Sequence, residues 1–194
     1  MEHKSKFSTY DVVVVGLMGA MVFVTTAFLK IQIPTPAGPT MFKIGNIFCL
    51  LAGLLFGGLR GGLAAGIGSA LYDLTNPVFV YDAPWTFIRF FLMAFLCGLI
   101  AHWGEHSGEN NRLNLVAAIA GSGFSTSFYL IKAVTELVLE GSAFDAAVAA
   151  CSVKMVTSGI NAVLAVAASV LIAPACRKAL VQAGLGERLN PVKT

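Results

Sequence analysis

Long apolar segments separated by short polar stretches make up most of this sequence. Residues 12–29 hold no charged side chain, and at about 1.5 Å of rise per helical residue they nearly cross a membrane core of roughly 30 Å. Similar segments recur and predict six membrane-spanning helices, at about residues 12–30, 44–59, 61–74, 84–103, 113–139 and 146–176. The pattern predicts an all-α, polytopic membrane protein: a six-transmembrane-helix bundle that forms a single membrane domain over residues 1–194, with a short cytoplasmic tail at 177–194.

Composition and charge support this topology. Of all residues, 57% are hydrophobic and 12% are charged, whereas a soluble domain of this size would expose far more charge. Basic residues stay in short cytoplasmic loops, and along an alternating path most of them fall on one side: Lys4, Lys6, Arg60, Arg112, Arg177, Lys178, Arg188 and Lys193. The opposite loops hold only Lys30 and Lys43, so both termini are predicted to be cytoplasmic. The net charge of +3 then reflects topology, and no nucleic acid partner is predicted.

Charged side chains interrupt the apolar segments. Arg89, Lys132, Glu136 and Lys154 lie inside them, and Asp73 lies at the edge of another. An ionised group in the membrane costs at least ~2.5 kcal/mol and usually faces a protein interior or a polar cavity. The predicted topology places all five in the outer third of the membrane, which indicates a polar site open to the outside. The alternative is that Lys132 and Glu136 merely pair one turn apart, while Arg89 and Lys154 extend to the lipid headgroups.

Two polar stripes support the polar site. Side chains three or four residues apart lie on one face of a helix, and two segments carry such stripes: Ser122, Ser125, Tyr129, Lys132 and Glu136 in one, and Lys154, Ser158 and Asn161 in the other. A polar stripe on a helix in lipid faces inward, so these residues are predicted to meet inside the bundle.

The two outer loops are typical of lids over a binding site. The first, residues 31–43, is stiffened by prolines that favour an extended chain: Pro34, Pro36 and Pro39. The second, residues 75–85, brings aromatic rings: Phe79, Tyr81 and Trp85. Such loops suit a flat, polar small molecule. An interfacial aromatic belt is the alternative, and the one-turn spacing of Trp85 and Arg89 would allow a cation–π contact.

Small residues predict close helix packing elsewhere. Glycines four apart overlap in the stretch LAGLLFGGLRGGLAAGIGSA, so the second and third helices are expected to pack with their backbones close together. No Gly-Lys-Ser/Thr follows these glycines, so the chain is predicted to lack an ATPase site. Gly16 and Ala20 form another small pair, which would pack either within the bundle or on a partner protein.

These features together resemble the S component of an energy-coupling factor (ECF) importer. The resemblance rests on the small pair in the first helix, the proline-rich loop, and KIGNIFCLLAGLLFGGLRGGLAAGIGSALYDL running into an aromatic loop. It implies a multi-pass protein of a prokaryotic cell membrane that captures a water-soluble vitamin or related micronutrient in an outward-facing pocket. It also implies delivery by reorientation in the lipid bilayer, with a transmembrane T component and two cytoplasmic ATPases as partners. No enzyme activity, cofactor or metal is implied.

The resemblance further implies roles for particular residues. The lid is the loop Ile33 to Lys43, with Pro34, Pro36, Pro39 and Thr40. The pocket residues are Trp85, Arg89, Tyr129, Lys132, Glu136, Lys154 and Asn161. The docking motif of the family is Ala-xxx-Ala, and this chain has Gly16 and Ala20 in its place.

The ligand is left open at this point. Arg89, Lys132 and Lys154 outnumber Glu136, which favours a ligand with an acid or several acceptor oxygens, although Asp73 and Asp82 would offset this. Riboflavin, a pyridoxine-like or pyrimidine vitamin precursor, pantothenate and a deazapurine base all fit.

Three other functions are alternatives to a capture subunit. A stand-alone secondary carrier would couple ion movement through Glu136, although the chain shows no clear inverted repeat. A membrane-embedded metalloenzyme would use His102, Glu105 and His106, whose letters match an inverted zinc-protease motif. A structural scaffold would bind no ligand.

Overall fold

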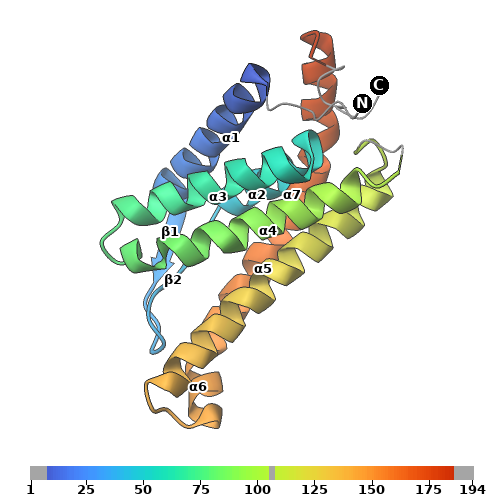
Figure 1. The fold of residues 1–194 in the computed structure, drawn as a ribbon. Coiled ribbons are helices and arrows are strands. Elements are labelled where there is room, and N and C mark those ends of the chain that lie inside the picture. Colours follow the sequence, from blue (N-terminus) through green and yellow to red (C-terminus); the bar gives the residue numbers. More distant parts are fainter. Residues whose placement is uncertain (1–7, 105–107, 186–194) are drawn as a thin grey trace, which may run out of the picture.

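The computed structural model describes residues 8–104 and 108–185. Its long helices overlap the six expected segments: α1 (Thr9–Phe28), α2 (Gly45–Phe56), α3 (Gly58–Thr75), α4 (Ala83–Ala101), α5 (Asn111–Leu139) and α7 (Ser152–Gln182). Short elements join them: β1 (Lys30–Ile33), β2 (Thr40–Lys43), the 3-10 helix η1 (Val80–Asp82) and α6 (Phe144–Ala150). Figure 1 shows these elements as a helical bundle with a small hairpin along one side.

Within the described residues, four helical stretches are long and apolar enough to cross a membrane: Thr9–Phe28, Val80–Ala101, Asn111–Leu139 and Ser152–Gln182. By contrast, α2 has only 12 residues, and α3 has the length but is rich in glycine. The mostly helical fold and the membrane assignment are therefore confirmed, while the count of six crossings and the side of the termini stay predictions.

The short α2 lies at the centre of the bundle. It packs against α1, α3, α4, α5 and α7, and every residue from Cys49 to Phe56 is buried, with Leu50 and Leu54 completely enclosed. Because other helices surround it, α2 exposes little of its own surface to the bilayer. Its burial explains why an element of this length is stable here.

Glycines allow α2, α3 and α4 to approach at backbone distance. A Cβ atom on Gly61 of α3 would lie 2.6 Å from the Gly53 backbone of α2, so the predicted close packing of these two helices is present. The glycines also admit α4, because a Cβ on Gly53 would lie 2.5 Å from the Ala94 carbonyl oxygen. Each contact leaves no room for a methyl group.

The loop predicted to be extended and stiff is a β-hairpin. β1 and β2 pair antiparallel, with Lys30 opposite Lys43 and Ile33 opposite Thr40. The turn between them is closed by the Gly38 amide, which donates to the Thr35 carbonyl oxygen at 3.0 Å, and Gly38 has a φ of +87° that favours glycine. The prolines lie between the paired strands, so pairing is confined to the residues on either side of them.

Two other boundaries differ from the predictions. The last predicted segment, 146–176, is divided into α6 and α7 at Cys151, and α7 continues to Gln182 instead of ending at 176.

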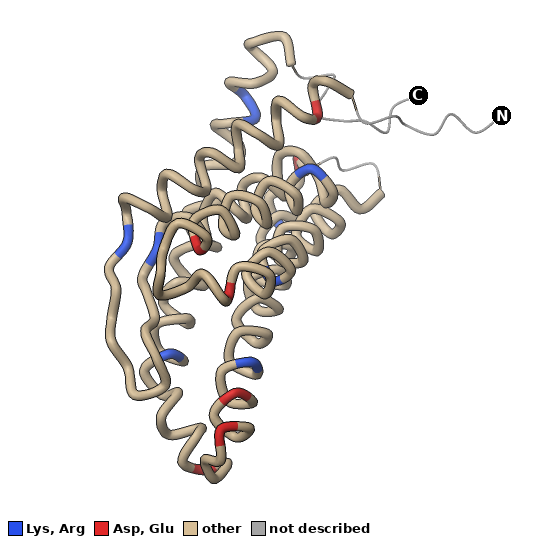
Figure 2. Tube along the Cα trace, turned by 60° about the vertical axis from the view of Figure 1, so that its left-hand side comes forward, with Lys and Arg blue, Asp and Glu red and all other residues tan. Residues whose placement is uncertain are grey.

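The start of α1, the α2–α3 turn and the end of α7 lie at one end of the bundle, whereas the hairpin, η1 and α6 lie toward the other (Figure 1). Basic and acidic positions occur along the helices as well as at their ends (Figure 2).

Candidate functional site

A polar cavity lies beneath the hairpin, between β2, α4, α5 and α7. Its volume is about 130 Å³, well above the roughly 15 Å³ that one water needs. Every residue expected in the pocket lines it: Trp85, Arg89, Tyr129, Lys132, Glu136, Lys154 and Asn161. The structure thus brings side chains from three separate helices to one space.

The predicted lid residues divide into two groups. Pro39 and Thr40 line the cavity, and Thr40 is buried. Pro34 and Pro36 are exposed on the hairpin and do not line the cavity. The part of the loop nearest the cavity is therefore the start of β2.

Five lining residues form an alternating row of cations and rings, which we call the cation–aromatic row: Lys43, Phe90, Arg89, Tyr129 and Lys154. The Lys43 ammonium and the Arg89 guanidinium lie 4.3 and 4.4 Å from the centre of the Phe90 ring. Arg89 and Lys154 lie 4.8 and 5.7 Å from the centre of the Tyr129 ring. Each ring is therefore in cation–π range of two cations, a contact that weakly stabilises positive charge.

No acidic side chain in the described part of the chain forms an ion pair with the cations in this row. Among the described residues, Lys43, Arg89 and Lys154 form no ion pair within 4 Å. Two buried atoms at the cavity also lack hydrogen-bond partners within the described ranges, namely Arg89 Nε and Asn46 Oδ1. Buried polar groups are nearly always paired, so unpaired atoms on two residues that line one cavity indicate a partner outside the described chain, either a water or a bound molecule.

Burial weakens the proton affinity of Lys43. This residue lies in β2, outside the membrane-spanning helices, and desolvation lowers the pKa of its ammonium group to about 8, with the Arg89 guanidinium acting in the same direction. The Asp73 carboxylate opposes this shift. Lys43 thus changes charge close to physiological pH.

Lys132 behaves differently from the other cations. Its ammonium donates to Asp82 Oδ1 at 2.8 Å and to Glu136 Oε1 one helical turn away. The pairing with Glu136 that the sequence offered as an alternative is present, and Asp82 is a second partner. Glu136 and Asp82 are half-exposed, so this cluster links η1 to α5 at the mouth of the cavity.

Hydrogen bonds hold β2 against the helices. The Asn161 side-chain amide donates to the Met41 carbonyl oxygen at 2.8 Å, and its oxygen accepts from the Lys43 amide at 3.2 Å. The Tyr129 hydroxyl donates to Thr40 Oγ1 at 3.4 Å. Asn161 therefore lines the cavity and at the same time positions the strand that covers it.

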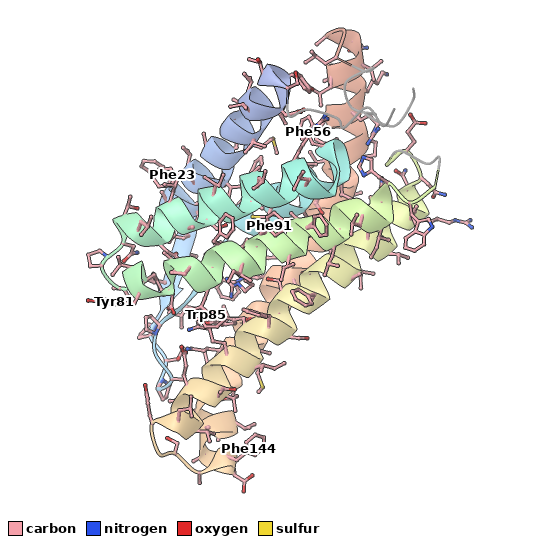
Figure 3. The ribbon with its side chains drawn as sticks, viewed as in Figure 1. Phe23, Phe56, Tyr81, Trp85, Phe91 and Phe144 are labelled. Carbon is pink, nitrogen blue, oxygen red and sulfur yellow. The ribbon has the colours of Figure 1, made fainter. Side chains whose placement is uncertain are left out.

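The aromatic loop contributes unevenly. Trp85 lines the cavity and is 51% exposed, and its ring lies 6.2 Å from that of Phe128 rather than against Arg89. Figure 3 shows Trp85 between the hairpin and α5, whereas Tyr81 lies at the outer edge and is 92% exposed. Phe79 also lines the cavity.

Several lining residues were not predicted. Asn46, Thr86 and Phe90 are uncharged and sit within apolar segments, so only their spacing carries a signal. Thr86 lies three residues before Arg89, and Phe90 follows Arg89 directly. Asn46 lies three residues after Lys43. A search for polar residues within one turn of a buried cation would have found Thr86 and Asn46.

The predicted docking pair lies on the outside of the bundle. Gly16 and Ala20 are exposed, and a Cβ on Gly16 would meet nothing within 4 Å. Their neighbour Gly19 packs instead, since its Cβ would lie 3.4 Å from the Ala64 carbonyl oxygen of α3. Of the two alternatives for the pair, packing within the bundle is not seen.

The proposed metal motif falls partly outside the described residues. Glu105 and His106 are not described, and His102 Nδ1 lies 3.0 Å from the Gly98 carbonyl oxygen. Across 8–104 and 108–185, no three His, Cys, Asp or Glu side chains are grouped as metal ligands.

The structure thus combines an apolar helical bundle with a polar cavity under a hairpin. The family model described as "ECF-type riboflavin transporter, S component" matches residues 6–178, most of the chain. The chain belongs to this family, which confirms the resemblance seen in the sequence. No curated protein matches the sequence. The chain is accordingly a substrate-binding subunit of an ECF transporter and not an enzyme.

Proposed function

We propose that this chain captures a small water-soluble vitamin in the cavity beneath the hairpin and delivers it inward by reorienting in the membrane of a prokaryotic cell. A transmembrane T component and two cytoplasmic ATPases would complete the importer. The observation that supports this most strongly is the polar cavity partly covered by β2, which Lys43, Arg89 and Lys154 line without an ion pair among the described residues. The proposal retains six crossings, with α2 and α3 among them and both ends cytoplasmic.

The cavity favours a ligand with a flat ring. Phe79, Trp85, Phe90, Phe128 and Tyr129 all line it, and aromatic rings bind a flat heteroaromatic molecule by stacking. The description of the family names riboflavin, so flavins are the first ligands to test. The pyridoxine-like and pyrimidine precursors and the deazapurine base also have flat rings, whereas pantothenate has none.

Reconstitution in liposomes tests the proposed function. The chain alone should bind its ligand without accumulating it, and accumulation should require the T component, both ATPases and ATP. Accumulation by the chain alone, driven by an ion gradient, would show a secondary carrier instead.

We predict that Ala20→Leu stops ATP-driven uptake in the reconstituted complex and leaves ligand affinity within about twofold. A leucine on this exposed face keeps a T-component helix from approaching closely, while no described residue of α1 lines the cavity. Uptake and equilibrium binding are measured on the same preparation.

Gly159→Leu is the matched control. Gly159 lies on α7 with nothing within 4 Å of its Cβ position. The substitution therefore adds the same leucine side chain to another exposed helix face. Equal loss of uptake in both variants, or loss of binding in Ala20→Leu, would rule out Gly16 and Ala20 as the docking surface.

A further inference from the structure

The charge around the inner cavity is unbalanced. Lys43, Arg89 and Lys154 line it without an ion pair among the described residues. Asp73 lines the same cavity, and it is buried, with 4% of its surface exposed. Asp82 and Glu136 also line the cavity and pair with Lys132, and this cluster carries one negative charge in excess. The charged lining residues are then four positive and three negative, so one net positive charge remains, and the unpaired cations are Lys43, Arg89 and Lys154.

The aromatic rings do not neutralise this excess. Phe90 and Tyr129 hold the cations by their π-faces, which stabilises positive charge and supplies no negative charge. Arg89 shares the Phe90 ring with Lys43 and the Tyr129 ring with Lys154. A guanidinium and two ammonium groups that line one cavity without an ion pair among the described residues form an arrangement that binds carboxylates and phosphates.

We propose that the cargo of this chain carries an anionic group, a carboxylate or a phosphate, which binds among Lys43, Arg89 and Lys154. This inference rests on the proposed function, and it narrows the substrate class of the same cavity. The ring of the cargo would lie toward Trp85 and Phe128, which line the same cavity. Uncharged riboflavin would stack on the aromatic rings but would leave the three cations without a counter-charge.

Inorganic phosphate is a probe that requires no knowledge of the cargo. The melting temperature of the full chain in detergent is measured in phosphate and in chloride at equal ionic strength. We expect phosphate to raise it in a saturable way that chloride does not reproduce. The rise should disappear in Lys154→Met and persist in Lys178→Met, which removes an exposed lysine near the far end of the same helix.

The outcomes of this experiment separate cleanly. Equal melting temperatures of the wild type in phosphate and chloride would overturn the inference, as would a phosphate effect that survives in Lys154→Met. Lys43→Met provides a second test on another element should Lys154→Met fail to fold.

Riboflavin and riboflavin 5′-phosphate share one ring system and differ in charge. We expect the phosphate ester to bind at least tenfold more tightly to the wild type, and the preference to fall in Lys154→Met. Tighter binding of uncharged riboflavin would overturn the anionic cargo and still support vitamin capture. Anion binding without any ATP-driven uptake would instead overturn the proposed function alone.

The anion effect should also depend on pH. Lys43 faces Arg89 of α4, Asp73 of α3 and Cys49 of α2, and the pKa of its ammonium group is about 8. Below that pH Lys43 is cationic, and above it the side chain becomes neutral. Sulfate keeps its charge over this range, so stabilisation by sulfate should decline from pH 7 to pH 9. The decline should be absent in Lys43→Met, and an identical decline there would exclude Lys43 as its cause.

Discussion

Replacing Arg89 by methionine is expected to weaken cargo binding by at least about a hundredfold while raising the thermal stability of the ligand-free protein. The two effects have one cause. Arg89 lies in cation–π range of the Phe90 and Tyr129 rings, so it is a partly buried cation without a counter-ion among the described residues. Such a group costs at least ~2.5 kcal/mol in a membrane, and an apolar side chain of similar length removes that cost together with the anion contact. Binding and melting temperature are measured on the same purified variant.

Arg112→Met is the control for this prediction. Arg112 is exposed near the start of α5, so its loss should change neither binding nor ligand-free stability. A fall in ligand-free stability of Arg89→Met, together with unchanged binding, would assign Arg89 to structural packing and contradict a role in capture.

Adding a single methyl group at Gly98 is expected to destabilise the fold by about 3 kcal/mol, near the upper end of overpacking effects. A Cβ atom there would lie 2.3 Å from the Gly58 nitrogen and 2.4 Å from the Gly57 carbonyl carbon. Both are backbone atoms, so the start of α3 must move away from α4. The measurement is the yield and melting temperature of Gly98→Ala in detergent.

Gly159→Ala is the matched control for Gly98→Ala. It makes the same change within a helix where nothing lies within 4 Å of the new atom. Alanine is the better helix former by about 1 kcal/mol, so this variant should be as stable as the wild type or more stable. Similar stability of both variants would contradict the backbone contact of α3 with α4.

The helices could be predicted because lipid imposes a simple pattern on them. A long apolar stretch is visible without knowledge of its neighbours, and each of the six expected segments contains a helix. The hairpin has no such signature. Its strands are only four residues each, the prolines between them dominate the local pattern, and the register depends on the turn at Gly38. The break at Cys151 likewise has no proline or glycine to mark it.

The cavity could be predicted because a charged side chain in a membrane has a high free-energy cost. Arg89 and Lys154 lie in segments where a charge needs a polar environment, and the structure places them at one cavity. The partners of these residues could not be predicted in the same way. Asp82 meets Lys132 across separate elements, and Phe90 lies under Lys43 and Arg89 only because β2 folds over α4. Contacts between distant segments depend on packing that no local pattern records.

The most direct test of the account is to identify, by mass spectrometry, the small molecule that stays with the purified protein. The wild type is compared with a variant in which a large side chain fills the cavity. Ala133 lines the cavity on α5 and is buried, whereas Ile131 on the same helix is 66% exposed. The wild type and Ile131→Trp should release the same heteroaromatic molecule with an acidic group, and Ala133→Trp should release none. Release of that molecule from Ala133→Trp, or of no molecule from any of the three proteins, would contradict capture in this cavity.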